Sequence, residues 1–149
     1  MNYNKIKEQI YNAGYCDERR LICHSNRSYT KTSSYLVAMK YTTYQTDFPV
    51  PAFFILSIKD DKLYISYAKA FGGFKKYYAS ILLNKLHYVS CELVNKSTMV
   101  YHFTINRESE GKGENNFYII ATRNKDDAKL LVDAIKEYNN ERYIININQ

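Results

Sequence analysis

The sequence lacks the features that mark membrane and secreted proteins. No apolar stretch approaches the roughly 20 residues of a membrane-spanning helix, and no apolar run near the N-terminus resembles a signal peptide. The three cysteines, Cys16, Cys23 and Cys91, are an odd number. At 149 residues the chain has the length of one domain. We therefore expect a single cytoplasmic domain with reduced thiols.

The residue patterns that carry catalysis or hold metals are missing as well. Gly72-Gly73 and the glycine-flanked Lys112 lack the strand-to-helix context of a phosphate loop, and no nucleophile elbow or zincin helix is present. Cysteine and histidine residues do not form the close ligand pairs typical of zinc sites; the adjacent Cys23 and His24 would point to opposite strand faces. We predict no catalytic residue, cofactor or metal site, with an enzyme of unrecognised type as the alternative.

Acidic residues are absent from one long segment. Residues 19–46 contain no Asp or Glu, residues 59–87 contain two aspartates against six lysines, and the net charge is +6. A positive field confined to part of a chain favours anionic partners, although ordinary solubility is the alternative. The candidate residues for binding an anion or a partner are Arg27, Lys31, Lys40, Lys69, Lys75 and Lys76.

Tyrosines are interleaved with these basic residues. Aromatic platforms beside basic side chains can hold single-stranded nucleic acid. Tyrosine also covers sheet surfaces well, and we favour that interpretation over nucleic-acid binding. The tyrosines concerned are Tyr29, Tyr35, Tyr41, Tyr44, Tyr64, Tyr77 and Tyr78.

Residues 52–81 predict a three-stranded meander. Residues 53–58 are almost all apolar, and residues 62–68 alternate in polarity, as strand residues do when one face is buried. Asp60-Asp61 favours a turn through side-chain bonds to the backbone, and Gly72-Gly73 supplies the positive φ of a tight turn. A third strand then begins near Lys75.

The remaining elements follow from the same patterns. We expect a short helix over 2–13, strands over 19–24, 35–44, 87–94, 98–105 and 116–122, and a loop or hairpin tip over 25–34. Residues 106–116 are predicted to be a flexible loop. In the strand over 87–94, we expect His87, Val89, Cys91 and Leu93 to share the core face.

A closing helix over 125–138 has the strongest pattern. Asn124 can cap it, and its apolar face consists of Ala128, Leu131, Ile135 and Tyr138. Lys129 and Lys136 lie off that face. We expect Asn139 and Asn140 to end the helix, and residues 143–147 to add an edge strand or pair with another subunit.

This succession of about seven antiparallel strands and one amphipathic helix resembles the pleckstrin-homology-like fold, particularly its bacterial members. The residues that carry the resemblance are the strand 53–58, the turn Asp60-Asp61, Leu63-Tyr64-Ile65, Phe74-Lys75-Lys76 and the helix 125–138. The resemblance implies a mainly β (α+β) split barrel closed by the C-terminal helix. It covers residues 19–139 of one domain (1–149), with an N-terminal helix in 1–18 and an edge strand or tail over 141–149.

The resemblance also bears on function, because many relatives bind membrane inositol lipids or peptides. It implies a non-enzymatic binding or scaffold module that engages a protein or peptide through a sheet edge or a groove beside the barrel. Peripheral association with an anionic membrane surface through the basic segments is one alternative, and nucleic acid is another. Homo-oligomerisation through the C-terminal strand is a further expectation.

Overall fold

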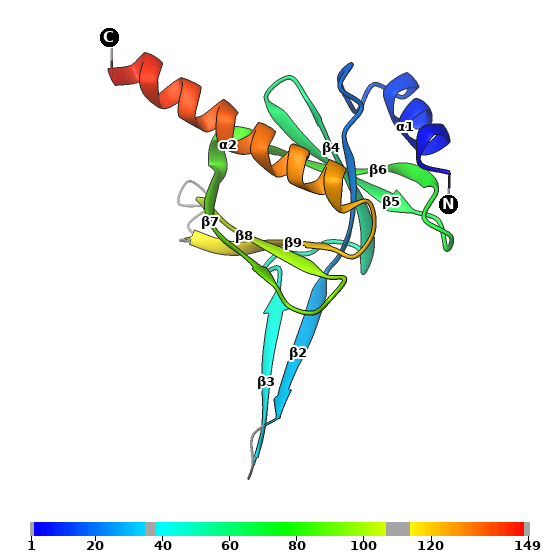
Figure 1. Cartoon of the computed structure of the whole chain (residues 1–149). Helices are drawn as coiled ribbons and strands as arrows, with labels where there is room; N and C mark the ends of the chain where they lie inside the picture. The colour runs from blue at the N-terminus through cyan, green and yellow to red at the C-terminus, as the bar shows by residue number, and fades with distance from the viewer. Residues whose placement is uncertain (1, 35–37, 107–113, 148–149) are drawn as a thin grey trace.

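The computed structural model describes residues 2–34, 38–106 and 114–147 (Figure 1). Its elements in chain order are α1 (Tyr3–Asn12), β1 (Ile22–Asn26), β2 (Ser28–Ser34), β3 (Met39–Gln45), β4 (Phe53–Lys59), β5 (Lys62–Ala68), β6 (Phe74–Leu82), a 3-10 turn η1 (Leu83–Lys85), β7 (Leu86–Leu93), β8 (Met99–Asn106), β9 (Glu114–Ala121) and α2 (Lys125–Ile147). The described part of the chain is therefore mainly β, as the sequence predicts.

The described strands form three antiparallel sheets. Sheet A has the order β1-β4-β5-β6, sheet C has the order β7-β8-β9, and the β2–β3 hairpin is inserted between β1 and β4. The meander over 52–81 is confirmed as β4-β5-β6, and Asp60 has the positive φ of 56° that its turn requires. The described sheets do not join into one closed barrel, so the split barrel stays a proposal.

The expectation of a loop or hairpin tip over 25–34 is wrong. Residues 28–34 form β2, whose register with β3 runs from Ser28↔Gln45 to Ser34↔Met39. Tyr29, Thr30 and Thr32 have side chains that favour a strand, and a partner strand supplies the backbone hydrogen bonds that a loop lacks. Figure 1 shows this hairpin extending away from the other two sheets. The strand predicted over 35–44 corresponds to β3, which begins at Met39. Residues 35–37 of the prediction lie outside the described residues.

The main core lies between sheets A and C and is covered by α2. It includes Leu56 and Leu63 from sheet A and Phe103 and Phe117 from sheet C. The predicted apolar face of α2 enters this core: Ala128, Leu131 and Ile135 are buried there, and Tyr138 packs against its margin. Lys129 and Lys136 are exposed, as predicted.

Two smaller clusters cover the outer faces of the sheets. Ile6 and Ile10 of α1 pack with Ile22 and Ile55 on sheet A. On sheet C, the apolar cluster of Val94, Val100 and Ile120 is packed against three tyrosines, which include Tyr29 and Tyr44 of the hairpin. The structure therefore has α1 outside sheet A and the base of the hairpin outside sheet C.

Helix α2 does not end at Asn139 and Asn140 but continues to Ile147. The edge strand predicted over 143–147 is therefore wrong, and the expected homo-oligomer through that strand loses its basis. The helical backbone beyond Tyr138 extends past the sheets in Figure 1. Asn124 has φ 51° and accepts the Ala128 N–H through its backbone carbonyl, while its side-chain nitrogen is buried without a hydrogen-bond partner.

The face predicted for β7 is also wrong. His87, Val89, Cys91 and Leu93 are all exposed. Leu86 and Tyr88 take the inner face, so His87 and Val89 lie on the other face. A register shift between Tyr88 and Ser90 then interrupts the alternation before Cys91. Leu86 is the buried residue of β7.

Candidate binding groove

The six predicted basic residues lie on three separate parts of the fold. Arg27 follows β1, Lys31 and Lys40 belong to the hairpin, and Lys69, Lys75 and Lys76 surround the β5–β6 turn. Two of them have side-chain partners: the Lys31 ammonium lies 2.8 Å from a carboxylate oxygen of Glu92, and the Lys76 ammonium lies 5.3 Å from the centre of the Tyr67 ring. The Arg27 guanidinium donates to the Val50 carbonyl at 3.5 Å.

The edges of sheet C differ in what covers them. Side chains occupy the edge at β9: the Tyr118 N–H donates to the Thr46 hydroxyl at 3.1 Å, and the Ile120 N–H donates to the Ser25 hydroxyl at 2.9 Å. The opposite edge, β7, pairs only with β8 among the described strands. A strand edge without a strand partner carries free N–H and C=O groups that can bind another extended chain.

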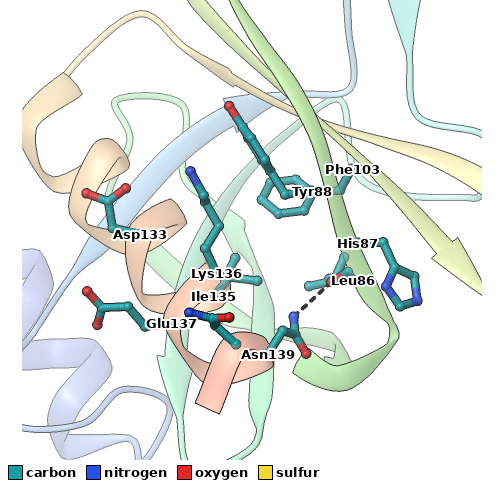
Figure 2. Close-up of a pocket in the computed structure, with 10 residues that line it drawn as sticks. Leu86, His87, Tyr88, Phe103, Asp133, Ile135, Lys136, Glu137 and Asn139 are labelled. Atoms are coloured by element: carbon teal, nitrogen blue, oxygen red, sulfur yellow. Dashed lines mark hydrogen bonds between the residues drawn. The ribbon is translucent and has the colours of Figure 1, made fainter. Parts of the chain in front are cut away.

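A groove of about 600 Å³ runs between β7 and α2. Its lining includes Leu86 and Tyr88 from β7, Phe103 from β8, and Ile135 from α2 (Figure 2). Leu86, Phe103 and Ile135 are buried, and the Tyr88 ring meets Phe103 edge-on, with ring centres 5.6 Å apart. Because Leu86, Phe103 and Ile135 have almost no exposed surface, the half-buried Tyr88 ring supplies apolar surface that a ligand in the groove can contact.

Asn139 closes one end of the groove. Its side-chain nitrogen donates to the carbonyl of Leu86 at 2.9 Å and to that of Leu83 at 3.1 Å. Backbone groups of alternate strand residues point to the same side. Since the Leu86 carbonyl faces α2, the N–H and C=O of Tyr88 face the groove as well.

Charged side chains line the outer wall of the groove. The Lys136 ammonium lies 4.2 Å from the centre of the Tyr88 ring, a cation–π geometry. Asp133 and Glu137 also line the groove and lie farther from β7 than Lys136 does in Figure 2. A hydrogen bond with Cys91, followed by burial, raises the pKa of Tyr88 to about 12, so its hydroxyl is neutral and remains a hydrogen-bond donor near pH 7.

A second groove, of about 560 Å³, follows the outer edge of β6. Tyr78, Ile81 and Leu82 line it together with Phe48 and Ile105. The Tyr78 hydroxyl donates to the Pro49 carbonyl at 3.1 Å, which ties the β3–β4 connection to this edge. Lys85 of η1 also lines this groove, and its lining residues include none from α1 or α2, in contrast to the groove beside β7.

A tether joins the hairpin to the far end of β7. The Glu92 carboxylate accepts hydrogen bonds from Lys31 of β2 and Tyr44 of β3. These two bonds lower the pKa of Glu92, and the bond to Glu92 raises the pKa of Tyr44 to about 12. The base of the hairpin is therefore fixed beside sheet C at neutral pH.

The cysteines and histidines are dispersed over the fold. Cys16 and Cys23 are buried, and Cys91 is exposed. His24 is buried and donates to the Gly72 carbonyl at 2.6 Å, while His102 stacks on Tyr118 with ring centres 4.5 Å apart. Within residues 2–34, 38–106 and 114–147, no three His, Cys, Asp or Glu side chains form a group that could hold a metal ion.

Sequence reasoning missed the groove residues Leu86, Tyr88 and Asn139. Leu86 lies between the predicted meander over 52–81 and the predicted strand over 87–94, and Asn139 lies at the predicted end of the closing helix. One available signal is the spacing of four residues between Ile135 and Asn139, which places both on adjacent turns of one helix face. Their position beside β7 is a long-range feature that local patterns do not encode.

Comparison with known protein families, with curated proteins and with solved structures found no match for this chain. None of the described helices is long and apolar enough to cross a membrane.

Proposed function

We propose that this protein is a non-enzymatic binding module of pleckstrin-homology-like type that takes an extended peptide along the free edge of β7. The fold assignment is supported by the strand order: a four-stranded sheet made of β1 and the β4-β5-β6 meander, then the β7-β8-β9 meander, and then a helix whose apolar face covers the core between them. The peptide mode is supported mainly by one observation, the unpaired β7 edge that faces α2 across an apolar groove.

The chemistry of the groove defines the peptide. Its backbone would pair with the N–H and C=O of Tyr88, which supplies affinity without sequence preference. One apolar side chain would lie against the half-buried Tyr88 ring, where burial of a Leu or Phe side chain contributes about 1.5–3 kcal/mol. A basic side chain on the outer flank would meet Asp133 and Glu137.

A peptide-display selection against the purified domain tests this mode. We expect the selection to enrich peptides with one large apolar residue and a neighbouring Lys or Arg. Tyr88→Pro removes the N–H on the groove edge and should weaken a selected peptide at least tenfold, the change expected from losing about 1.4 kcal/mol. Leu82→Ala, in the groove beside β6, is the matched control and should leave affinity unchanged. Loss of binding with Leu82→Ala and retention with Tyr88→Pro would refute the assignment.

A fold check accompanies Tyr88→Pro, since proline can disturb the β7–β8 ladder as well as the free edge. Asp133→Lys with Glu137→Lys leaves β7 intact and reverses the charge of the outer wall. This second variant should reduce binding of a basic peptide selected on the wild-type domain. Unchanged affinity in a correctly folded double variant would contradict the proposed recognition of a basic residue.

A further inference from the structure

The turn between β5 and β6 presents a single aromatic side chain to solvent. Phe71 is 91% exposed, whereas Tyr41 on the β2–β3 hairpin is 63% exposed. Lone exposed apolar residues are common. The Phe71 ring differs from most of them because it is almost fully exposed at the tip of a hairpin, where packing within the protein does not explain its position.

The turn is held in place by specific bonds. The Lys69 N–H donates to the Gly73 carbonyl at 2.7 Å, and the Gly72 N–H donates to the Lys69 carbonyl at 2.8 Å. Gly72 has φ 90°, a conformation that favours glycine. Beneath the turn, the buried His24 donates to the Gly72 carbonyl at 2.6 Å. These contacts fix the backbone on both sides of Phe71.

The packing of His24 adds to this support. Its ring stacks on Phe53 with centres 5.4 Å apart and meets Tyr3 of α1 edge-on at 5.7 Å. The turn is therefore anchored to β1, β4 and α1. Phe71 projects from a rigid base instead of a loosely held loop.

Three lysines lie within five residues of Phe71 in the chain. Lys69, Lys75 and Lys76 are all exposed, and the sequence contains no Asp or Glu between residues 62 and 91. The two aspartates of this hairpin, Asp60 and Asp61, are at its opposite end, in the β4–β5 turn. The tip thus combines an exposed phenyl ring with three exposed lysines, of which Lys76 also lies over the Tyr67 ring.

We propose that this turn docks on an anionic bilayer surface, with Phe71 in the interfacial region and Lys69, Lys75 and Lys76 at the level of the lipid phosphates. A protruding ring suits a soft surface that it can enter, whereas a peptide partner would need a groove and single-stranded nucleic acid would need a platform of stacked rings. Lysines near an anionic leaflet each strengthen binding by about fivefold, which corresponds to about 1 kcal/mol. This site is separate from the groove beside β7.

The absence of tryptophan from the chain permits a direct test. Phe71→Trp places the sole indole at the tip of the turn. On mixing with vesicles of phosphatidylcholine and phosphatidylserine at low ionic strength, its emission should shift to the blue, and brominated lipids should quench it. Vesicles of phosphatidylcholine alone should give neither change. Met39→Trp, at a position 56% exposed on the hairpin, is the matched control and should keep the emission of a solvated indole.

Sedimentation with the same vesicles measures the two contributions separately. Phe71→Ser should lose most binding, and Lys75→Gln with Lys76→Gln should weaken it by about 25-fold, at about fivefold per lysine. Met39→Ser should bind as the wild type does, and thermal melts should show all variants folded. If wild-type protein fails to sediment with anionic vesicles, or if Phe71→Ser sediments equally well, the proposal is wrong. Sedimentation lost only with the lysine variant would also refute insertion of the ring.

Discussion

The side chain of Asn139 donates a 2.9 Å hydrogen bond to the backbone carbonyl of Leu86. Asn139 lies in the part of α2 that the sequence assigns to the end of the helix, and Leu86 begins β7. The bond, together with the one to the Leu83 carbonyl, links α2 to the edge strand on which the proposed peptide site depends. Because the helix continues through Asn139, its side-chain amide lies within hydrogen-bond distance of the Leu83 and Leu86 carbonyls.

Replacing Asn139 by Ala should therefore destabilise the fold. Asn139→Ala leaves the Leu86 carbonyl without this donor, whereas the Leu83 carbonyl still accepts the Leu86 N–H; an unsatisfied buried acceptor costs about 1–3 kcal/mol. The adjacent Asn140 is exposed, so Asn140→Ala should change the free energy of unfolding by less than about 0.5 kcal/mol. Urea denaturation of Asn139→Ala and Asn140→Ala measures this difference. Equal unfolding midpoints would contradict the structural role of the Asn139 bonds.

Truncation of the buried face of α2 should have a larger effect. Leu131 and Ile135 are almost completely buried in the main core, and Leu→Ala or Ile→Ala at such a site costs about 2–5 kcal/mol through lost contacts and a residual cavity. Lys129→Ala, on the exposed side of the same helix, should cost less than about 0.5 kcal/mol. Lys136→Ala also removes the contact with Tyr88, worth about 0.5–1 kcal/mol at an exposed site. If thermal melts give the same melting temperature for all four variants, α2 does not cover the core.

Acidification should weaken the fold through His24. Burial, with a smaller contribution from Arg123, lowers the pKa of His24 in the folded protein, whereas the unfolded chain titrates near about 6.5. The unfolded state then binds more protons as pH falls below about 6.5, so the stability contributed by neutral His24 is fully present above that pH and is lost below it. Melting temperatures of wild type and His24→Gln, measured from pH 7.5 to 5, should converge or cross as the pH falls. A parallel decline in both proteins would assign the pH dependence to other groups.

The tether at Glu92 should control how firmly the hairpin is held. Glu92→Gln keeps the shape of the side chain but removes the charge that pairs with Lys31 and bonds to Tyr44. Trypsin should then cleave within the hairpin, at Lys31 or Lys40, faster than in the wild-type protein. Glu8→Gln on α1 is an exposed control that should leave the rate unchanged. Identical cleavage in all three proteins would show that the tether does not restrain the hairpin.

The same tether should depend on pH. Bonds from Lys31 and Tyr44 lower the pKa of Glu92 in the folded state. The stability that the tether contributes is therefore present above the unfolded pKa of about 4.3 and is lost as pH falls through the lower folded value. NMR shifts of the Tyr44 ring should follow this titration in the wild type and not in Glu92→Gln.

The central meander could be predicted because its signals are local. Alternation in β5 and the aspartates of the β4–β5 turn lie within a few residues of the structures they form, and Asp60 takes the positive φ that its turn needs. The apolar face of α2 is equally local, since Leu131 and Ile135 are one turn apart. These elements account for most of the main core.

The errors occur where distant contacts decide the outcome. Residues 28–34 have the polar composition of a loop, but pairing with β3 makes them a strand. The irregularity after Tyr88 shifts the faces of β7, and no residue type marks it in the sequence. The polar pair Asn139-Asn140 is typical of a helix end, but bonds from Asn139 to Leu83 and Leu86 favour a longer helix. The groove beside β7 requires both the observed faces of β7 and the longer α2.

Backbone amide hydrogen exchange in the presence of a display-selected peptide tests the proposed function most directly. The account predicts that exchange at the Tyr88 N–H slows on binding, because the peptide backbone accepts from that group, while exchange along the β6 edge at Ser80 and Leu82 stays as it is in the free protein. Protection of Ser80 or Leu82 with no change at Tyr88 would contradict the account and move the peptide site to the other groove.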